Sequence, residues 1–421
     1  MPAPLTLGID LGTSGIRAIA IDPAGTIQGQ GTARIAPEHR RDPEAIWHSV
    51  IEALDALRPH VYMPAIRAIA IDGTSGTILV TDDHATPIGP ATLYSDRSTP
   101  AAVARIAAIA PRDSAAHGNA SPLARLLDLP HTTARRHALH EADWITYRLG
   151  GPFGVSDANN ALKTGYDPTS GTWPAWIDRL GLAVTLPRVV EPGTDLAPID
   201  PALAARFGLD PATRLIAGTT DGCASFLATG ADQPGDGVTA LGSTLTIKLL
   251  SNQPVFAPDF GIYSHRLLGN FLPGGASSAG AAILARHFTP AQLADLSRHI
   301  DPARDSGLDY YPLPAPGERF PINDPALQPR LTPRPADDAH FLHGLLEGLA
   351  RIEALGYQRL AELGAPRLRR VLTVGGGAIN PVWTALRARI LGVPVSPATQ
   401  TDAAVGTARL ARIGLTSRDR P

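Results

Sequence analysis

The sequence predicts a two-domain protein of the α/β class, and three observations lead to that prediction. The chain has 421 residues, more than a single hydrophobic core usually organises. Short apolar runs alternate with stretches of helical spacing, and polar residues gather where the runs end. A strand–turn–strand pattern at Leu7–Asp22 recurs, weakly in sequence, at Gly237–Leu250. We therefore divide the chain at the turn Gln233–Asp236, into domains of residues 1–235 and 236–421.

The first of these patterns, LGIDLGTSGIRAIAID, places two apolar runs around a tight turn and predicts a β-hairpin. The first run ends near Asp10, and the turn supplies Gly12, Thr13 and Ser14. Glycine lets the backbone approach an anion closely, and successive N–H groups form a nest of phosphate size. A carboxylate beside a bound phosphate is also a natural place for Mg²⁺, which keeps waters and phosphate oxygens as ligands. An ordinary glycine-rich hairpin is the alternative, and this stretch alone does not decide.

The rest of the first domain alternates strands and helices. Further strands are expected at residues 25–36, 66–72, 78–81 and 214–218. Helices are expected at residues 42–57, 122–129, 138–149, 173–180 and 223–230. The polar, turn-rich stretch 153–172 is expected to be irregular structure near a cleft. Ligands of such α/β folds bind at the carboxyl ends of the strands, so the polar residues there are site candidates.

The second domain follows the same plan. Strands are expected within 237–250 and at 269–271, 370–374 and 393–396. A Gly-Gly-Ala-Ser-Ser loop that becomes a helix is expected at 273–288, and further helices at 339–363, 382–391 and 402–413. Residues 289–335 are dense in proline, and we interpret them as a surface excursion.

Asp221 is the candidate general base. It follows the apolar run RLIAG and precedes a helix of small residues, so it lies at a strand mouth and near a helix N-terminus. A sugar hydroxyl loses its proton as it attacks a phosphoryl group, and a positioned aspartate can accept that proton. The alternative is an aspartate that only caps the helix.

Three other segments carry candidate binding residues. The run Gly375–Gly377 with Asn380 indicates backbone close to a flat ligand, with Trp383 nearby as either a ligand contact or core packing. Ser95-Asp96-Arg97 either contacts a polyol or forms a solvated turn. The Thr244 hydroxyl is expected to help cradle phosphate.

Composition excludes several classes of protein. The net charge of −2 gives no reason to expect nucleic acid or a membrane as a partner, and no apolar stretch predicts a membrane span. The single cysteine, Cys223, excludes an intrachain disulfide and fits a reducing cytoplasm. The 13 histidines form no recognisable ligand pair, so no structural metal is expected. Neither of the two lysines lies in a P-loop motif.

Taken in order, five motifs resemble the successive signatures of the FGGY carbohydrate kinases, within the hexokinase/actin/Hsp70 ATPase superfamily. The motifs are LGIDLGTSGIRAIAID, AGTTDGCASFLATGA, ALGST, LPGGASSAGAAIL and VLTVGGGAINPVW. The resemblance runs from Leu7 to about Gly414, and the whole set at this spacing is far more specific than any single motif. It implies two RNase-H-like domains that flank a catalytic cleft, the first binding mainly sugar and the second mainly ATP with Mg²⁺.

The resemblance also assigns residues. Asp221 matches the catalytic aspartate, and Asp10 would lie near both the sugar and Mg²⁺, the metal held through water. Gly12, Thr13 and Ser14 would form the first phosphate loop. The remaining assignments are a second phosphate loop at Gly242, Ser243 and Thr244, an adenosine site at Gly275, Ala276, Gly376, Gly377, Ala378 and Asn380, and sugar contacts at Thr74, Ser75, Asp96 and Arg97.

The chain also departs from the family pattern. It is short, it has Thr74-Ser75 where xylulose kinases usually have Met-His, and its lysine-aromatic signature is degenerate at Leu123–Leu129. These departures resemble the compact branch described as D-ribulose kinase or xylulose-kinase-like. The expected activity is ATP-dependent phosphorylation of a ketopentose, most simply D-ribulose. A kinase of D-xylulose or another polyol, and an actin-like ATPase that binds sugar without phosphotransfer, are the alternatives; monomer and homodimer remain open.

Overall fold

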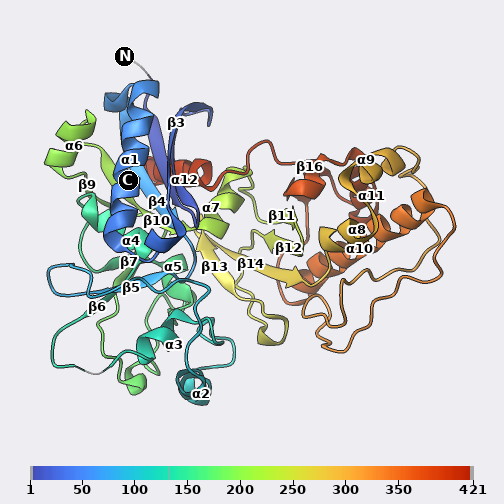
Figure 1. Ribbon diagram of the computed structural model, residues 1–421, viewed down its shortest axis with the longest axis horizontal. Helices are drawn as coiled ribbons and strands as arrows, with labels where there is room; N and C mark the ends of the chain where they lie inside the picture. The colour runs from blue at the N-terminus through green and yellow to red at the C-terminus, as the bar shows by residue number, and fades with distance from the viewer. Residues whose placement is uncertain (1–2, 131, 418–421) are drawn as a thin grey trace. The chain divides into compact units, whose positions relative to one another are not determined.

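The protein is known from a computed structural model that describes residues 3–130 and 132–417. The chain forms two compact units, Met1–Ala228 with Gln400–Pro421, and Thr229–Thr399. This differs from the predicted division at residues 235 and 236, because the last helix belongs to the first unit (Figure 1). None of the helices in the described ranges combines the length and apolar character needed to cross a membrane.

The first unit is built on a mixed sheet with the strand order β3-β2-β1-β4-β10-β9. Its strands are β1 (Leu5–Leu11), β2 (Gly15–Ile21), β3 (Ile27–Arg34), β4 (Ile66–Gly73), β9 (Asp195–Pro198) and β10 (Arg214–Thr220). Strands β1, β2 and β3 are antiparallel, so the opening hairpin is confirmed. Strand β4 runs parallel to β1 and β10 runs parallel to β4, which brings three strand ends to one edge of the sheet.

The two faces of this sheet are covered by different helices. Helices α1 (Pro43–Leu57) and α4 (Glu141–Arg148) share one core with the alternate residues Leu7, Ile9 and Leu11 of β1. Helix α1 begins where Asp42 accepts a hydrogen bond from the Glu44 N–H, as its Asp-Pro-Glu start predicts. Helices α7 (Asp221–Ala228) and α12 (Ala403–Ser417) pack together, and α12 lies on the opposite face of the sheet.

Small residues make this second packing possible. A Cβ added at Gly8 would lie 1.9 Å from the carbonyl oxygen of Ala404. A Cβ added at Gly406 would lie 1.8 Å from the carbonyl oxygen of Ala224. Helix α12 can therefore approach both β1 and α7 only where no side chain intervenes. This contact explains why residues 403–417 belong to the first unit.

The second unit repeats the plan of the first. Its sheet has the order β13-β14-β12-β11-β15-β16. The strands are β11 (Asp236–Leu241), β12 (Leu245–Leu249), β13 (Ser264–Leu267), β14 (Asn270–Ser277), β15 (Arg370–Val374) and β16 (Val395–Pro397). As in the first unit, a hairpin (β11 and β12) is extended by a third antiparallel strand (β14). On its other side β11 pairs with the parallel strand β15, which pairs in turn with β16. The repeat in the sequence therefore corresponds to a repeat in topology.

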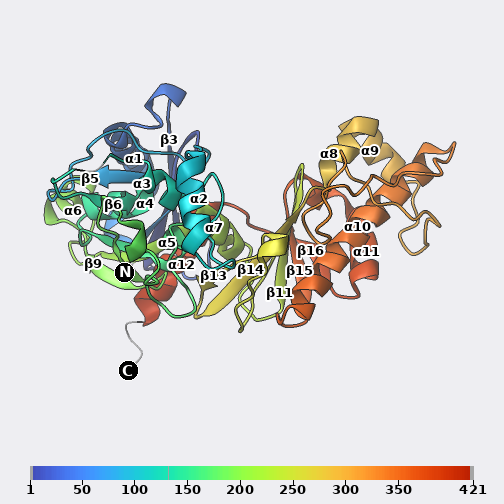
Figure 2. The same ribbon diagram turned by 90° about the horizontal axis from the view of Figure 1, so that it is seen from below.

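Four helices lie together in this unit (Figure 2). They are α8 (Ala281–His287), α9 (Pro290–Ser297), α10 (Asp338–Glu362) and α11 (Pro381–Leu391). Helix α10 packs against β12, α9 and α11, and its apolar face forms the centre of the core. The predicted long helix and the predicted strand at 370–374 are both confirmed.

Several predicted elements were wrong. Residues 137–140 form strand β6 (His137–His140) ahead of α4, because they pair with β5 (Ile78–Thr81). The stretch expected to be irregular contains β7 (Val155–Asp157) and α5 (Ala158–Leu162), and β7 pairs with β8 (Arg188–Val190). Residues 273–277 continue β14, and 173–180 hold only a 3₁₀ turn at Asp178–Leu180. Helices α2 (Pro100–Ile109), α3 (Pro122–Leu127) and α6 (Pro201–Phe207) complete the first unit, and of these only α3 was expected.

Candidate active site

Three aspartates meet at the carboxyl edge of the first sheet. In the register of β1 and β4, Asp10 lies opposite Asp72, and Thr219 of β10 lies opposite Asp72 on the other side. Asp221 follows directly as the first residue of α7. The Asp72 side chain is completely buried, whereas Asp10 and Asp221 are half-buried. The structure thus brings Asp10 and Asp221, both predicted as site residues, to one edge of the sheet. Asp72 lies between them.

The electrostatics of this group follow from burial and crowding. Burial raises the pKa of Asp10, an effect that Asp72 and Arg17 oppose and that the charges of Asp221 and Asp402 reinforce. Burial also raises the pKa of Asp72 well above its usual range, and the charge of Asp10 acts in the same direction. Asp10 and Asp72 therefore resist carrying full negative charges at the same time beside Asp221.

Sequence reasoning assigned no role to Asp72. The Thr407 hydroxyl of α12 donates a hydrogen bond to its Oδ2, while Oδ1 has no hydrogen-bond partner among the described residues. A signal was present, because IDGTSG at the end of β4 repeats the IDLGTSG of the opening hairpin with one residue fewer. Because adjacent parallel strands end at the same edge, this second motif places its aspartate beside the first.

The two predicted phosphate turns have matching positions in the two units. Thr13 and Ser14 are exposed in the turn between β1 and β2, and Ser243 and Thr244 are exposed in the turn between β11 and β12. The second turn is fixed from behind, because the Ala281 N–H at the start of α8 donates to the Gly242 carbonyl at 2.9 Å. Both turns thus present hydroxyl groups and backbone at the end of a sheet, as phosphate loops require.

The predicted sugar contacts are in different environments. Thr74 is buried and its hydroxyl lies 2.6 Å from that of Thr77, whereas the Ser75 hydroxyl is buried without a partner in the described structure. Asp96 accepts two hydrogen bonds from Arg41, at 2.5 and 2.7 Å, and this pairing lowers the pKa of Asp96. Its carboxylate also accepts from the Leu93 N–H within its own turn, and Arg97 is exposed beside it.

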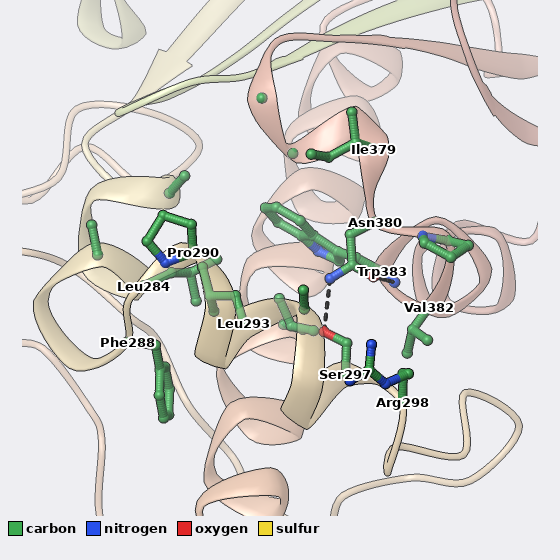
Figure 3. Close-up of a pocket in the computed structure, with 17 residues that line it drawn as sticks. Leu284, Phe288, Pro290, Leu293, Ser297, Arg298, Ile379, Asn380, Val382 and Trp383 are labelled. Atoms are coloured by element: carbon green, nitrogen blue, oxygen red, sulfur yellow. Dashed lines mark hydrogen bonds between the residues drawn. The ribbon is translucent and has the colours of Figure 1, made fainter.

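The second unit holds an apolar cavity of about 420 Å³ among α8, α9 and the start of α11 (Figure 3). Gly376, Gly377 and Asn380 line it, whereas Gly275, Ala276 and Ala378 are not among its lining residues. Helices α8 and α9 form the opposite wall, which sequence reasoning missed. That wall consists of Ala281, Leu284, Ala285, Phe288, Pro290, Leu293, Ala294, Ser297 and Arg298. The apolar spacing of residues 281–298 indicates this wall, but the predicted boundary between a helix and a surface excursion falls at 288 and 289, inside that segment.

Hydrogen bonds of Asn380 and close packing of Gly377 on Trp383 hold the glycine-rich side of the cavity. The Asn380 Oδ1 accepts from the Trp383 N–H at 3.1 Å and caps α11, while its Nδ2 donates to the Ser297 hydroxyl at 2.9 Å (Figure 3). A Cβ added at Gly377 would lie 2.6 Å from the Trp383 ring, but one added at Gly376 would meet nothing within 4 Å. Trp383 is only 2% exposed, so it both packs in the core and lines the cavity.

Gly275 makes room for an aromatic ring in this structure. A Cβ at this position would lie 2.7 Å from the Phe320 ring, so the glycine admits a side chain from the proline-dense segment against β14. Glu318 in the same segment accepts from the Ser277 hydroxyl at 2.5 Å and from the Ser278 N–H at 2.7 Å. The proline-dense segment thus fixes the end of β14 just before α8.

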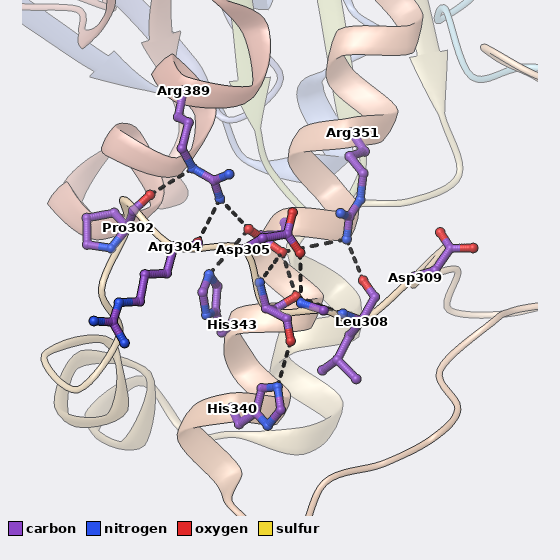
Figure 4. Close-up of polar contacts among 12 residues, drawn as sticks. Pro302, Arg304, Asp305, Leu308, Asp309, His340, His343, Arg351 and Arg389 are labelled. Carbon is purple, nitrogen blue, oxygen red and sulfur yellow. Dashed lines mark hydrogen bonds and ion pairs between the residues drawn. The ribbon is translucent and has the colours of Figure 1, made fainter.

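A second anchor of this segment is Glu347 in the middle of α10. Its ion-pair partners are His343, Arg351 and Arg389 (Figure 4). Its fully buried carboxylate accepts from the N–H and the hydroxyl of Ser306, at 3.0 and 2.5 Å, and pairs with Arg389 of α11. Burial raises the pKa of Glu347, but hydrogen bonds from His343, Ser306 and Arg389 outweigh it and lower the pKa to about 2. Arg389 also donates to the carbonyl of Pro302 at 2.9 Å. The chain that follows α9 is therefore fixed to α10 and α11 beside the cavity.

Comparison with known proteins identifies the family. Residues 5–120 match the N-terminal domain of the FGGY family of carbohydrate kinases, and residues 244–415 match its C-terminal domain. The chain belongs to this family. The fold class expected from the sequence is confirmed, as two α/β domains of the sugar kinase/actin-like ATPase type.

Relatives of this FGGY kinase match it over nearly its whole length. A xylulose kinase of Escherichia coli is 24% identical over 97% of this chain and 89% of its own. A glycerol kinase of Gloeobacter violaceus is 27% identical over 97% of this chain and 88% of its own. A crystal structure of xylulose kinase from Rhodospirillum rubrum superposes with a TM-score of 0.81 at 23% identity, covering 97% of this chain and 90% of that one.

The residues of the FGGY kinase fit a Mg²⁺ ion that is bound mainly through its nucleotide. No group of three or more His, Cys, Asp or Glu side chains in the described residues could hold a metal ion by itself. Mg²⁺ commonly uses one or two carboxylates and fills its shell with waters and phosphate oxygens. The half-buried carboxylate of Asp10, opposite Asp72 in the register of β1 and β4, supplies an oxygen ligand of the required kind.

Proposed function

We propose that this FGGY kinase transfers the γ-phosphoryl group of ATP to the terminal hydroxyl of a ketopentose, D-ribulose, to give D-ribulose 5-phosphate. The observation that carries the proposal is the position of Asp221, which begins α7 at the same sheet edge as Asp10 and Asp72. The relatives named xylulose kinase support a ketopentose. The Thr74-Ser75 pair, where xylulose kinases usually have Met-His, argues against D-xylulose, and the compact branch that the chain resembles is described as D-ribulose kinase or xylulose-kinase-like.

In this proposal the two units have separate roles. The first unit binds the sugar, with Asp10, Thr74 and Ser75 as contacts and with Asp96 and Arg97 in the neighbouring turn. The second unit binds ATP, with Gly376, Gly377 and Asn380 at the adenosine and Ser243 and Thr244 at the phosphates. The apolar cavity between α8, α9 and Asn380 is of a size and character that suit a purine base.

Asp221 accepts the proton of the C5 hydroxyl as its oxygen attacks the γ-phosphorus, and the bond to the ADP oxygen breaks. The backbone and hydroxyl groups of the two turns donate hydrogen bonds to the phosphoryl oxygens. Asp10 would hold Mg²⁺ through water, and the metal supplies charge neutralisation on the phosphates. The hydrogen bond from Thr407 to Asp72 fixes the buried carboxyl group that lies between Asp10 and Asp221. Exclusion of water from the loaded site favours transfer over hydrolysis of ATP.

The test is ADP release from the purified protein with Mg·ATP and a panel of ketoses, aldoses and polyols. We expect the highest kcat/KM with D-ribulose, and stoichiometric formation of the 5-phosphate. A preference for D-xylulose or glycerol, as the names of the relatives allow, would replace the proposed substrate but keep the kinase assignment. ADP release that no sugar stimulates would select an ATPase and overturn the proposal.

A further inference from the structure

A buried arginine lies beside the proposed sugar site, and no carboxylate of the described residues forms an ion pair with it. Arg125 lies on α3 and is 6% exposed. Its Nε donates to the Thr92 hydroxyl at 3.1 Å, and its Nη1 donates to the carbonyls of Asp96 and Ala120, at 3.2 and 2.8 Å. Its Nη2 donates to the Gly76 carbonyl. None of these hydrogen bonds within the described chain reaches a carboxylate oxygen.

The acceptors of Arg125 belong to separate loops. Gly76 closes the loop after β4 that carries Thr74 and Ser75, and Asp96 lies in the turn that carries Arg97. Ala120 lies in the connection just before α3. The two loops that the sequence analysis assigned to the sugar, from separate motifs, are thus joined by one side chain.

We infer that Arg125 is a positioning residue of the sugar site, which sets the loop of Thr74 and Ser75 against the turn of Asp96 and Arg97. This inference rests on the proposed function, because it concerns the same sugar site. Arg125 itself does not touch the reacting atoms in this proposal. Its substrate-related effect is on the shape of the site, and so on which sugar binds and how tightly.

The chemistry of the guanidinium explains why arginine is needed here. A planar fork with five N–H donors reaches carbonyls in several directions at once, whereas a lysine ammonium acts as a compact point charge. Burial of the guanidinium lowers the pKa of Arg125, and the nearby charge of Asp96 partly opposes this. A buried cation is tolerated only when its donors are satisfied, so the four acceptors must stay in place. The loops and the guanidinium therefore fix one another.

The packing around Arg125 separates this role from that of an ordinary core residue. Leu123 and Ala124 of the same helix are buried in a hydrophobic cluster with Trp176 and Ile177, independently of the guanidinium. A Cβ at Gly76 would lie 3.9 Å from Nη2, and Gly76 has φ of +101°, a conformation that favours glycine. Removal of the guanidinium is thus expected to release the loops while α3 stays packed.

The test compares Arg125→Ala and Arg125→Lys with Arg105→Ala, at an exposed position of α2, as the control. Arg105 also donates to a carbonyl, that of Leu180 at 2.6 Å, but contacts neither sugar loop through that bond. We expect Arg125→Ala to raise KM for the sugar about tenfold or more, with an unchanged Kd for ATP. Arg125→Lys is expected to restore little of the loss, and added guanidinium ion should restore much of it to Arg125→Ala. The control is expected to stay within about twofold of the wild type.

The possible results separate the inference from the proposed function. A wild-type protein with no sugar-stimulated ADP release would overturn the proposed function. A sugar-stimulated wild type together with an Arg125→Ala variant whose sugar KM matches that of the control would overturn the inference alone. An equal loss of sugar and ATP affinity, with no recovery on adding guanidinium, would also overturn it. If Arg125→Ala does not fold, Thr92→Val decides: a sugar KM raised severalfold at constant ATP affinity supports the inference, and an unchanged KM overturns it.

Discussion

The clearest pH-dependent prediction concerns Asp157, which ends β7 and caps α5. Its Oδ1 accepts from the Asn159 and Asn160 N–H groups, at 2.8 and 3.1 Å, and its Oδ2 accepts from the Asn160 side chain at 2.6 Å. Complete burial and the charge of Asp143 nevertheless raise the pKa of Asp157 from 3.8 to about 7. His140 lies against Asp143, with Nδ1 3.0 Å from its Oδ2. Between pH 3.8 and about pH 7, the Asp157 carboxyl is therefore protonated in the folded protein and ionised in the unfolded chain.

The sign and size of the effect follow from this difference. Between the unfolded and folded pKa values the folded state binds more protons, so raising the pH through that window lowers the free energy of unfolding. Each pKa unit corresponds to about 1.4 kcal/mol. From pH 5 to pH 8 the Asp157 carboxyl should therefore remove roughly 3 kcal/mol of stability. Asp157→Asn keeps an oxygen for the N–H groups and removes the titration.

The measurement is urea denaturation of the wild type and Asp157→Asn at pH 5, 6.5 and 8. We expect the variant to gain stability relative to the wild type as the pH rises, by about 3 kcal/mol over the range. Asp178→Asn, at an exposed position of the same unit, serves as the control and should show no such gain. Parallel curves for the wild type and Asp157→Asn would refute the reasoning, because they would mean that Asp157 ionises equally in both states.

Three further predictions concern the site and its supports. Asp221→Ala should leave the Kd for ATP nearly unchanged while kcat falls by about 10²–10⁴-fold, and near-normal turnover would remove Asp221 as the general base. Gly377→Ala, which forces a methyl group against Trp383, should destabilise the fold by about 1–3 kcal/mol. Gly376→Ala should change stability by less than about 0.5 kcal/mol, so equal melting temperatures for the two variants would contradict the packing. Because the pKa of Glu347 is lowered to about 2, its contribution is present above pH 4.5 and is lost as the pH falls toward 2. Glu347→Gln should therefore flatten the acid limb of the stability curve measured by circular dichroism, and an unchanged limb would argue against this anchor.

Local patterns predicted the parts of the fold that local forces decide. The sequence predicts three such features correctly, because each depends on neighbouring residues. They are the hairpin at the start of each unit, the cap of α1 at Asp42 and the apolar face of α10. Strand β6 was not, because His137–His140 becomes a strand only by pairing with β5 from far earlier in the chain. The apolar residues of β6 continue the helical spacing of α4, so the pattern predicts a single helix across both elements.

The candidate site shows the same division. Asp10 and Asp221 were identified from their own motifs, but Asp72 was missed because its importance comes from register with Asp10 across two parallel strands. The wall of the cavity formed by α8 and α9 was missed because proline-dense sequence hid a short helix that begins at Pro290. Arg125 was not identified, although it lies in the degenerate signature Leu123–Leu129, because three of its four acceptors lie 29 to 49 residues away in sequence.

The return of α12 to the first sheet has a practical consequence for anyone who dissects this chain. The second unit is topologically an insertion, entered after Ala228 and left before Gln400. A fragment of residues 1–228 would expose the apolar face that Ala404, Val405 and Ala408 cover, and Asp72 would lose the Thr407 hydroxyl. One continuous segment of the chain, Thr229–Thr399, therefore forms the second unit, whereas the first unit needs residues from before and after that segment, joined by a linker where the insertion is removed.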